Sequence, residues 1–249
     1  MLGKEKIKRI KSLEYKKFRD ELGLFIAEGE KLAGEILKSN IQIESLFCLP
    51  DAILPNHNVK AEIISENEMK RISLLKTPSK AFIIAQIPHK KINFSQINNS
   101  LNIVLDDIQD PGNLGTIIRL CDWFGIGNII CSPKTADCFS PKSVQSTMGA
   151  ICRVNVFYAD LNDFLNTVAK NITVYGTFLD GENIYTAKLL QQGLIIMGNE
   201  GKGISHETEK YVTKKLHIPC FSNNAVKAES LNVSVATAII CSEFKRRFL

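Results

Sequence analysis

The chain has 249 residues, 45% of them hydrophobic and 23% charged, the balance of an ordinary soluble globular protein. No apolar run approaches the roughly 20 residues that a membrane-spanning helix needs, and residues 1–19 lack the apolar stretch of a secretion signal. We therefore expect a cytoplasmic protein, with no membrane contact, that forms one large domain or two modest ones.

The formal net charge of +5 comes entirely from the first part of the chain. Residues 1–100 hold 17 Lys and Arg against 12 Asp and Glu, whereas residues 101–249 hold 14 of each. The excess is densest in residues 1–19, which contain Lys4, Lys6, Lys8, Arg9, Lys11, Lys16, Lys17 and Arg19. A basic arm of this kind favours contact with RNA phosphates. The alternative is a solvated helix face that keeps the protein soluble.

Residues 1–89 are predicted to form a small α/β unit. The pattern indicates helices at 30–39 and 65–75 and strands at 43–49, 62–64 and 81–87. Ser65, followed by Glu68 three positions later, has the spacing of a helix capping box. Residues 90–100 are polar without strong periodicity, so we expect a linker there.

From residue 101 to residue 249, apolar strands alternate with helices. Strands are predicted at 101–106, 128–131, 172–178, 194–198 and 216–219, and helices at 114–124, 141–149, 161–170, 206–212 and 231–248. This alternation indicates a parallel sheet covered on both faces. Because such sheets bind ligands at the carboxyl ends of their strands, the loops after the strands are the candidate site.

The first candidate loop runs from Asp107 to Arg119, with the sequence DIQDPGNLGTIIR. Its Pro-Gly pair predicts a tight turn, and Asn113 is placed to cap the following helix. The neighbours of Arg119 are apolar, which predicts a largely buried helix. A buried guanidinium needs an anionic partner, either Glu200 or an RNA phosphate or ribose.

Metal and thiol chemistry are not expected. Asp106, Asp107 and Asp110 lack regular ligand spacing, so turn and cap roles are favoured over a metal site. The seven cysteines include no C-x-x-C pair and no zinc-type spacing, and several lie inside apolar runs. We expect buried free thiols in a reducing compartment rather than nucleophiles.

The second candidate loop, residues 196–204 (IMGNEGKGI), follows an apolar strand. Its glycines permit a close approach of backbone to a ligand. The spacing is neither that of a Rossmann fingerprint nor that of a P-loop, which needs Ser or Thr where Gly203 stands. A plain strand-to-helix connection is the alternative to a ligand loop.

The third candidate segment, residues 230–236 (SLNVSVA), opens a long apolar helix. Ser and Asn are good helix-start residues because their side chains accept from free backbone N–H groups. A capping role and a catalytic role are therefore both open for Ser230 and Asn232.

In this order and with these residues, the three segments resemble the three motifs of the SpoU (TrmH-like) RNA 2′-O-ribose methyltransferases of the SPOUT superfamily. The resemblance implies an α/β fold, in which a C-terminal knotted parallel-sheet methyltransferase domain follows a small N-terminal α/β substrate-binding domain. It also implies S-adenosyl-L-methionine as cofactor, RNA as partner, a trefoil knot and a homodimer. The apolar last helix, with Val235, Ala236, Ile239, Ile240, Phe244 and Phe248, offers surface for such a dimer.

The same resemblance implies two sets of site residues. Those at the reaction centre would be Asn113, Arg119, Glu200, Ser230 and Asn232. Those in contact with the cofactor would be Thr177, Gly198, Ile218 and Leu231. Arg119 would position the ribose-phosphate and assist deprotonation, although a guanidinium stays protonated in proteins, which makes a true base role demanding; Glu200 would hold Arg119. The chain departs from the family pattern at residues 220–229, a longer loop without glycine, which affects the expected adenine-side contacts.

The expected function is S-adenosylmethionine-dependent 2′-O-ribose methylation of structured RNA, with ribosomal RNA favoured and transfer RNA as the alternative. A non-catalytic RNA-binding or ribosome-assembly protein on the same scaffold is a rival, but it has no need of all five reaction-centre residues. A small-molecule methyltransferase leaves the basic first part without a purpose.

Overall fold

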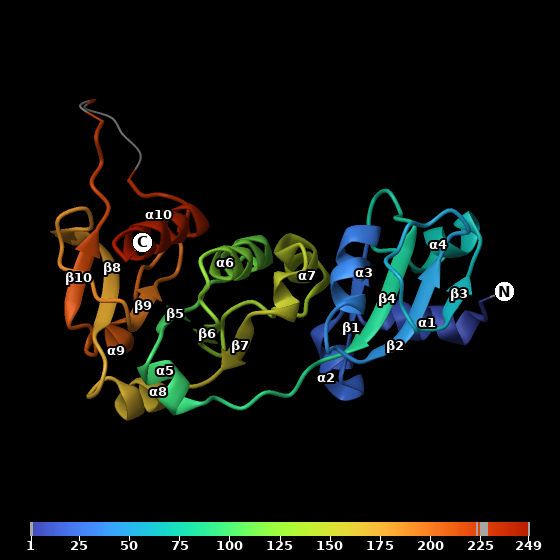
Figure 1. The fold of residues 1–249 in the computed structure, drawn as a ribbon, viewed down its shortest axis with the longest axis horizontal. Helices are drawn as coiled ribbons and strands as arrows, with labels where there is room; N and C mark the ends of the chain where they lie inside the picture. The colour runs from blue at the N-terminus through green and yellow to red at the C-terminus, as the bar shows by residue number, and fades with distance from the viewer. Residues whose placement is uncertain (1, 223, 225–228, 249) are drawn as a thin grey trace. The chain divides into compact units, whose positions relative to one another are not determined.

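The computed structural model describes residues 2–222, 224 and 229–248. The chain forms two compact units, which we describe separately (Figure 1). The N-terminal unit comprises Met1–His89 and Asp137–Cys152, and the C-terminal unit comprises Lys90–Ala136 and Arg153–Leu249. No helix of the described residues has the length and apolar character needed to cross a membrane.

The N-terminal unit is built on a four-stranded mixed sheet. Its elements are α1 (Lys4–Ser12), α2 (Lys16–Leu22), β1 (Leu24–Glu28), α3 (Glu30–Leu37), β2 (Ile43–Cys48), β3 (Ala61–Ile63), α4 (Glu66–Ile72), β4 (Ala81–Gln86), α7 (Pro141–Thr147) and the short 3₁₀ helix η1 (Ala150–Cys152). The strand order is β1-β4-β2-β3. The β1–β4 and β4–β2 pairs are antiparallel, whereas β2 and β3 are parallel.

Both faces of this sheet are buried. On one face, Ile10 of α1 and Met69 of α4 pack with Phe82 of β4. On the other, Val144 of α7 packs with Ile83 of β4 and with residues of α3. Because β4 alternates its side chains between two cores, it appears in the sequence as a continuous apolar run. The capping box predicted at Ser65 and Glu68 is confirmed at the start of α4.

The basic segment at the start of the chain forms α1 and α2 and is part of this folded unit, which corrects the expectation of an arm. Ile10 and Leu13 are buried in the core. Some of its cations also have acidic partners: Lys6 lies 2.6 Å from Glu62, and Arg9 lies 2.8 Å from Glu44. Charge composition alone cannot distinguish cations paired within the fold from cations left free.

The C-terminal unit is built on a parallel sheet, as predicted, although the sheet has six strands rather than the five expected. Its elements are α5 (Phe94–Asn98), β5 (Leu101–Leu105), α6 (Pro111–Trp123), β6 (Asn128–Cys131), β7 (Asn155–Tyr158), α8 (Leu161–Val168), β8 (Val174–Asn183), β9 (Gly193–Met197), α9 (His206–Glu209), β10 (Lys214–His217) and α10 (Val233–Arg246). The strand order is β10-β8-β9-β5-β6-β7, and every pair is parallel.

Helices cover both faces of the parallel sheet (Figure 1). On one face, Phe164 and Leu165 of α8 pack with Val104 and Ile196 of the central strands. On the other, α6 and α10 lie against each other. The ring of Phe244 in α10 stands edge-on to Tyr175 of β8, with centroids 4.9 Å apart. The carboxyl ends of the strands are left free for loops, which is where the three sequence motifs begin.

Two elements of this unit were not predicted. Strand β7 lies at the edge of the sheet, and only Phe157 of its four residues is buried, so it lacks an apolar run. Helix α5 lies within the predicted linker and buries only Ile97. Strand β8 is also longer than predicted, because its pairing with β10 shifts from Gly176 to Glu182 and then continues.

Candidate functional site

Helix α6 begins earlier than predicted, and this sets the direction of Asn113. Asp110 is the N-cap, and its carboxylate accepts the backbone N–H of Asn113 at 2.9 Å. Pro111 takes the first helical position, for which its fixed φ is suited. The prediction that Asn113 caps this helix is therefore wrong. Asn113 lies within the first turn, and its side-chain amide is available for other contacts.

That amide joins residues from all three sequence motifs. Asn113 Nδ2 donates to Oε1 of Glu200 at 2.9 Å, and its Oδ1 accepts from Nδ2 of Asn232 at 3.1 Å. Asn232 is also the N-cap of α10, because its Oδ1 accepts the backbone N–H of Ser234 at 2.9 Å. The capping interpretation of Asn232 is thus confirmed. The same side chain also contributes to the cluster of polar groups.

Arg119 does not pair with Glu200, which corrects the expectation that Glu200 holds it. Its side chain is exposed, and no ion pair is formed by Arg119 with any residue that the structure describes. The reason is helical geometry: Ile118 and Cys121 face the core of the unit, and a residue between them, rotated by about 100° per position, points outward. The guanidinium can contact a ligand without first breaking an ion pair.

The glycines of the second motif are explained by the way its loop folds on itself. Asn199 and Gly203 exchange two backbone hydrogen bonds of 2.9 Å. A Cβ on Gly198 would lie 2.2 Å from the carbonyl carbon of Gly203, and Gly203 itself has a φ of +71°, a region that favours glycine. Loop closure therefore requires both glycines, and it presents Glu200 at the exposed tip.

Asn199 is a positioning residue that the sequence interpretation missed. Its Nδ2 donates to the carbonyl oxygen of Asp107 at 2.7 Å, which ties the second motif to the first. Its Oδ1 accepts the backbone N–H groups of Gly201 and Lys202, both at 3.0 Å. An Asn within a glycine-rich loop is the available signal, because Asn side chains often bond the backbone two residues later.

Among the three aspartates near the end of β5, Asp110 has the predicted cap role, whereas Asp106 and Asp107 bond serines of other loops. Asp110 caps α6. Asp106 accepts from the backbone N–H of Ser205 at 2.8 Å and from its hydroxyl at 2.7 Å. Asp107, in the left-handed region with φ 60°, accepts the hydroxyl of Ser132 at 2.6 Å. These bonds anchor the loops that carry Asn113 and Glu200.

The predicted cofactor residues lie at the carboxyl ends of neighbouring strands. Thr177 lies within β8, one position beyond the last pair of that strand with β9, and donates from Oγ1 to the carbonyl oxygen of Ile196 at 3.1 Å. Gly198 follows β9 and Ile218 follows β10, and these three strands are adjacent in the sheet. Leu231, like Ser230, is exposed just before α10. Of the predicted loop 220–229, residues 223 and 225–228 lie outside the described residues.

Five of the seven thiols are buried, as predicted, whereas Cys152 is partly exposed and Cys220 is exposed. Cys121 of α6 and Cys241 of α10 are both inaccessible to solvent. Burial raises the pKa of the Cys241 thiol to about 12, and burial also raises the pKa of Cys121 well above its ordinary value. Because the thiolate is the nucleophilic form, these two cysteines serve packing rather than chemistry.

Two family models match the chain. Residues 100–242 match the SpoU rRNA Methylase family, and residues 4–82 match the MRM3-like substrate binding domain. The 23S rRNA (guanosine(2553)-2′-O)-methyltransferase RlmP of Bacillus subtilis is 29% identical over 241 residues, which cover 95% of this chain and 94% of that protein. The 23S rRNA (uridine(2479)-2′-O)-methyltransferase of Streptomyces viridochromogenes is 25% identical over 230 residues, covering 88% and 73%.

Solved structures align over nearly the whole chain. One assigned to the TrmH family of RNA methyltransferases, from Porphyromonas gingivalis, has a TM-score of 0.87 at 37% identity and covers 99% of both chains. An AdoMet-bound rRNA methyltransferase from Sinorhizobium meliloti has a TM-score of 0.85 at 28% identity and covers 100% of this chain and 97% of that one. Together with the motif residues and the parallel sheet, these matches show that the chain belongs to the SpoU rRNA methylase family.

Proposed function

We propose that this protein transfers a methyl group from S-adenosyl-L-methionine to a ribose 2′-oxygen of ribosomal RNA. The observation that carries the proposal is the hydrogen-bonded set of Asn113, Glu200 and Asn232, drawn from three distant segments to the carboxyl edge of one parallel sheet. The relatives from B. subtilis and S. viridochromogenes, both named for 2′-O-methylation of 23S rRNA, support the substrate class.

The chain itself must hold the ribose and assist the loss of a proton. Methyl transfer is a displacement that requires the 2′-oxygen in line with the methyl group and the removal of a proton of high pKa. Arg119 lies on the same helix as Asn113 and is exposed, so its planar guanidinium can bind a phosphate or ribose oxygen. Glu200 is exposed as well, which leaves its carboxylate accessible to an RNA hydroxyl. Ser230 and Asn232 order the segment that leads into α10.

The arrangement of the strands supports the cofactor site that we propose from the sequence. Gly198 and Ile218 directly follow β9 and β10, and Thr177 lies in the adjacent strand β8 just beyond its last pair with β9. Backbone groups at such positions can contact a ligand. Leu231 precedes the helix that Asn232 caps. When bound, S-adenosylmethionine supplies a methyl group on a sulfonium. The residues of this chain bind and orient it.

We assign a separate function to each of the two segments that match a family model. We assign RNA binding to residues 1–89, a linker to 90–100 and the methyltransferase to 101–249. The matches to an MRM3-like substrate binding domain at 4–82 and to the SpoU model at 100–242 support these bounds. We also propose a cytoplasmic location, which fractionation of cells would test.

We also propose a homodimer that uses α6 and α10. Trp123 at the end of α6 is 83% exposed, and Val235 in α10 is exposed as well, although the two helices pack together. An apolar surface of this kind favours association with a second copy. Of the residues expected at the interface, Ile240 and Phe244 instead belong to the core of the unit.

The trefoil knot of the family is proposed for this chain too. Arg247, just after α10, donates to the carbonyl oxygens of Ile184, Tyr185 and Ala187. These residues connect β8 to β9, so the end of the chain is tied to a loop in the middle of the unit. A crystal structure in which α10 lies outside every loop of the unit would contradict the proposal.

The function is tested by transfer of a labelled methyl group to RNA. Total RNA from a strain lacking the gene is incubated with the protein and methyl-labelled cofactor, and the labelled species are separated by size. We expect label in ribosomal RNA, located on ribose and mapped to defined nucleotides. Label in transfer RNA alone would show that the substrate is transfer RNA rather than ribosomal RNA. Folded protein that binds the cofactor and transfers nothing would instead indicate a binding protein.

A further inference from the structure

Helix α2 carries an exposed apolar stripe within the most basic part of the chain. Tyr15 is the N-cap of α2, and Phe18 and Leu22, four positions apart, lie on one side of the helix that follows it. Tyr15 is 62% exposed, and Phe18 and Leu22 are each 37% exposed. Two aromatic rings next to each other on a charged surface need a physical explanation, because isolated exposed apolar residues are ordinary but adjacent ones are less so.

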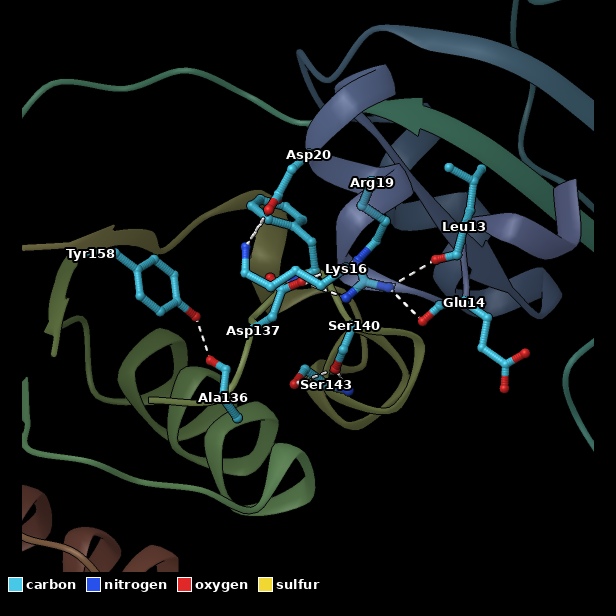
Figure 2. A network of polar contacts seen from close by, with 11 residues as sticks. Leu13, Glu14, Lys16, Arg19, Asp20, Ala136, Asp137, Ser140, Ser143 and Tyr158 are labelled. Carbon is cyan, nitrogen blue, oxygen red and sulfur yellow. Dashed lines mark hydrogen bonds and ion pairs between the residues drawn. The ribbon is translucent and has the colours of Figure 1, made fainter. Parts of the chain in front are cut away.

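The turn that carries Tyr15 is fixed from below by a buried arginine. Arg19 Nη1 donates to the carbonyl oxygens of Leu13 and Glu14, at 2.8 and 2.7 Å. Its Nε and Nη2 donate to Oδ2 of Asp137, at 3.0 and 2.6 Å (Figure 2). The Arg19 side chain is only 3% exposed. It therefore cannot serve as the RNA contact that composition suggested, and it instead holds the α1–α2 turn in one conformation.

Exposed lysines lie on the same two helices as the stripe. Lys11 at the end of α1 and Lys17 in α2 are exposed and form no ion pair with the residues that the structure describes. The Lys17 ammonium lies 5.9 Å from the centroid of the Phe18 ring. Lys4 and Lys8 share the helix face of Lys11, being spaced by four and three positions, and they are likewise exposed.

Acidic groups on these two helices do not cancel this charge. Asp20 is paired with Lys16 at 2.7 Å. Glu5, Glu14 and Glu21 are exposed, so over the two helices the four lysines at positions 4, 8, 11 and 17 exceed these three carboxylates by one. A ligand that combines negative charge with flat apolar faces is complementary to this surface.

We propose that Tyr15 and Phe18 stack on unpaired bases of the RNA substrate, while Lys11 and Lys17 bind the adjacent phosphates. Recognition of single-stranded RNA commonly combines aromatic platforms with a basic surface. The turn is fixed before binding, so little conformational freedom is lost when a base stacks on Tyr15. The inference rests on the proposed RNA methyltransferase function and adds to it the class of RNA element that the N-terminal unit recognises.

The test distinguishes the contribution of the bases to binding from the contribution of the phosphates. Affinity is measured for a 12-nucleotide oligoadenylate and for an abasic ribose-phosphate oligomer of the same length and charge. Stacking contributes about 1–3 kcal/mol per base, so Tyr15→Ala should weaken binding to the oligoadenylate by about 5- to 150-fold and leave binding to the abasic oligomer unchanged. Tyr15→Trp should keep the wild-type affinity, because an indole also stacks. Lys11→Gln and Lys17→Gln should weaken both complexes equally.

Matched controls guard against unfolding and against a failure of the proposed function. Ile53→Ala removes another exposed apolar side chain of the same unit and should change neither affinity. Thermal melting should be unchanged in Tyr15→Ala. Equal affinity of the wild type for both oligomers, or an equal loss on both in Tyr15→Ala, would overturn the stacking role. If the wild-type protein preferred the oligoadenylate but transferred no methyl group, the proposed methyltransferase function would be refuted and the stacking role of Tyr15 and Phe18 would stand.

Discussion

One hydrogen bond of 2.9 Å joins Asn113 Nδ2 to Oε1 of Glu200 across 87 positions of sequence. Asn113 lies in the first turn of α6, and Glu200 lies at the tip of the loop after β9. Strands β5 and β9 are neighbours in the sheet, so the loops that follow them emerge side by side. The bond therefore reports how the parallel sheet brings two distant motifs together at its carboxyl edge.

Removing the central amide should damage the reaction more than the fold. In Asn113→Ala, Glu200 and Asn232 both lose a partner, and a misplacement near 1 Å at a reacting centre can lower the rate about 10²-fold. Because the groups are partly exposed, the free energy of unfolding should fall by no more than about 1 kcal/mol. Methyl-transfer rates and thermal melts measure the two effects. Thr116→Ala, one turn further along α6, is the control and should change neither. A melting temperature that falls in step with activity would indicate a structural role.

Arg119→Ala should lower turnover by about 10²-fold or more, the cost of losing a charged group that stabilises a reacting oxygen. Cofactor affinity should stay within a few-fold, because the proposed cofactor residues lie elsewhere. The melting temperature should not change, since the side chain is exposed and without an ion pair among the described residues. Lys170→Ala, which removes an exposed cation of the same unit, serves as the control. Wild-type turnover in Arg119→Ala would eliminate the assigned role.

The free lysines of α1 should contribute to RNA affinity through phosphates. Deleting residues 1–19 would remove buried core residues such as Ile10 and Leu13, so substitutions are the better experiment. The triple variant Lys4→Gln, Lys8→Gln and Lys11→Gln should bind RNA more weakly. Its plot of log affinity against log salt should have a slope smaller by about 2, at about 0.7 to 0.9 per phosphate contact.

A second triple variant controls for net charge in that experiment. Lys38→Gln, Lys60→Gln and Lys70→Gln also remove three exposed cations from the N-terminal unit. We expect its salt slope to stay close to that of the wild type. If both triple variants changed the slope equally, general charge rather than the α1 face would attract the RNA.

Tryptophan fluorescence should detect formation of the dimer, because Trp123 is the only tryptophan of the chain. Its emission should shift to shorter wavelength as the protein concentration rises through the dissociation constant, since the indole leaves water. Light scattering should give twice the single-chain mass of 27.8 kDa. Trp123→Glu and Val235→Asp should each yield the single-chain mass. Wild-type protein with that mass at micromolar concentration would refute the dimer.

The N-terminal unit should lose stability in acid through Glu68. Hydrogen bonds from the backbone N–H of Ser65, the backbone N–H of Leu2 and the Ser65 hydroxyl lower the pKa of Glu68 from 4.5 to about 2. A carboxylate with a depressed folded pKa stabilises the fold above its unfolded value. This contribution should therefore be lost as pH falls from about 4.5 towards about 2.

Melts followed by circular dichroism across this pH range measure the effect. Glu68→Gln should lower the melting temperature at neutral pH and flatten its decline below pH 4.5. Glu66→Gln, in the same first turn of α4, is the control and should keep the wild-type pH dependence. Parallel declines in Glu68→Gln and the wild type would show that other carboxylates govern acid unfolding.

The regular elements were largely predictable, because their causes are local. Buried strands such as β5 and β9 appear as apolar runs, and the capping box at Ser65 and Glu68 is written in four consecutive residues. Strand β7 and helix α5 were not predicted, since each buries only one side chain. The start of α6 was misplaced because Asp110 and Asn113 are both good caps, and only the position of Pro111 within the helix distinguishes them.

The sequence by itself determined the family, the parallel α/β architecture and the identity of the motif residues, because periodicity, capping and motif spacing act over a few neighbouring positions. Only the tertiary structure decided which of those residues meet. It turned Arg119 outward, gave Glu200 to Asn113 and buried Arg19 against Asp137. Such pairings form between residues that are dozens of positions apart in the sequence, so they depend on how the elements pack. The free energy of that packing is a sum over the whole core.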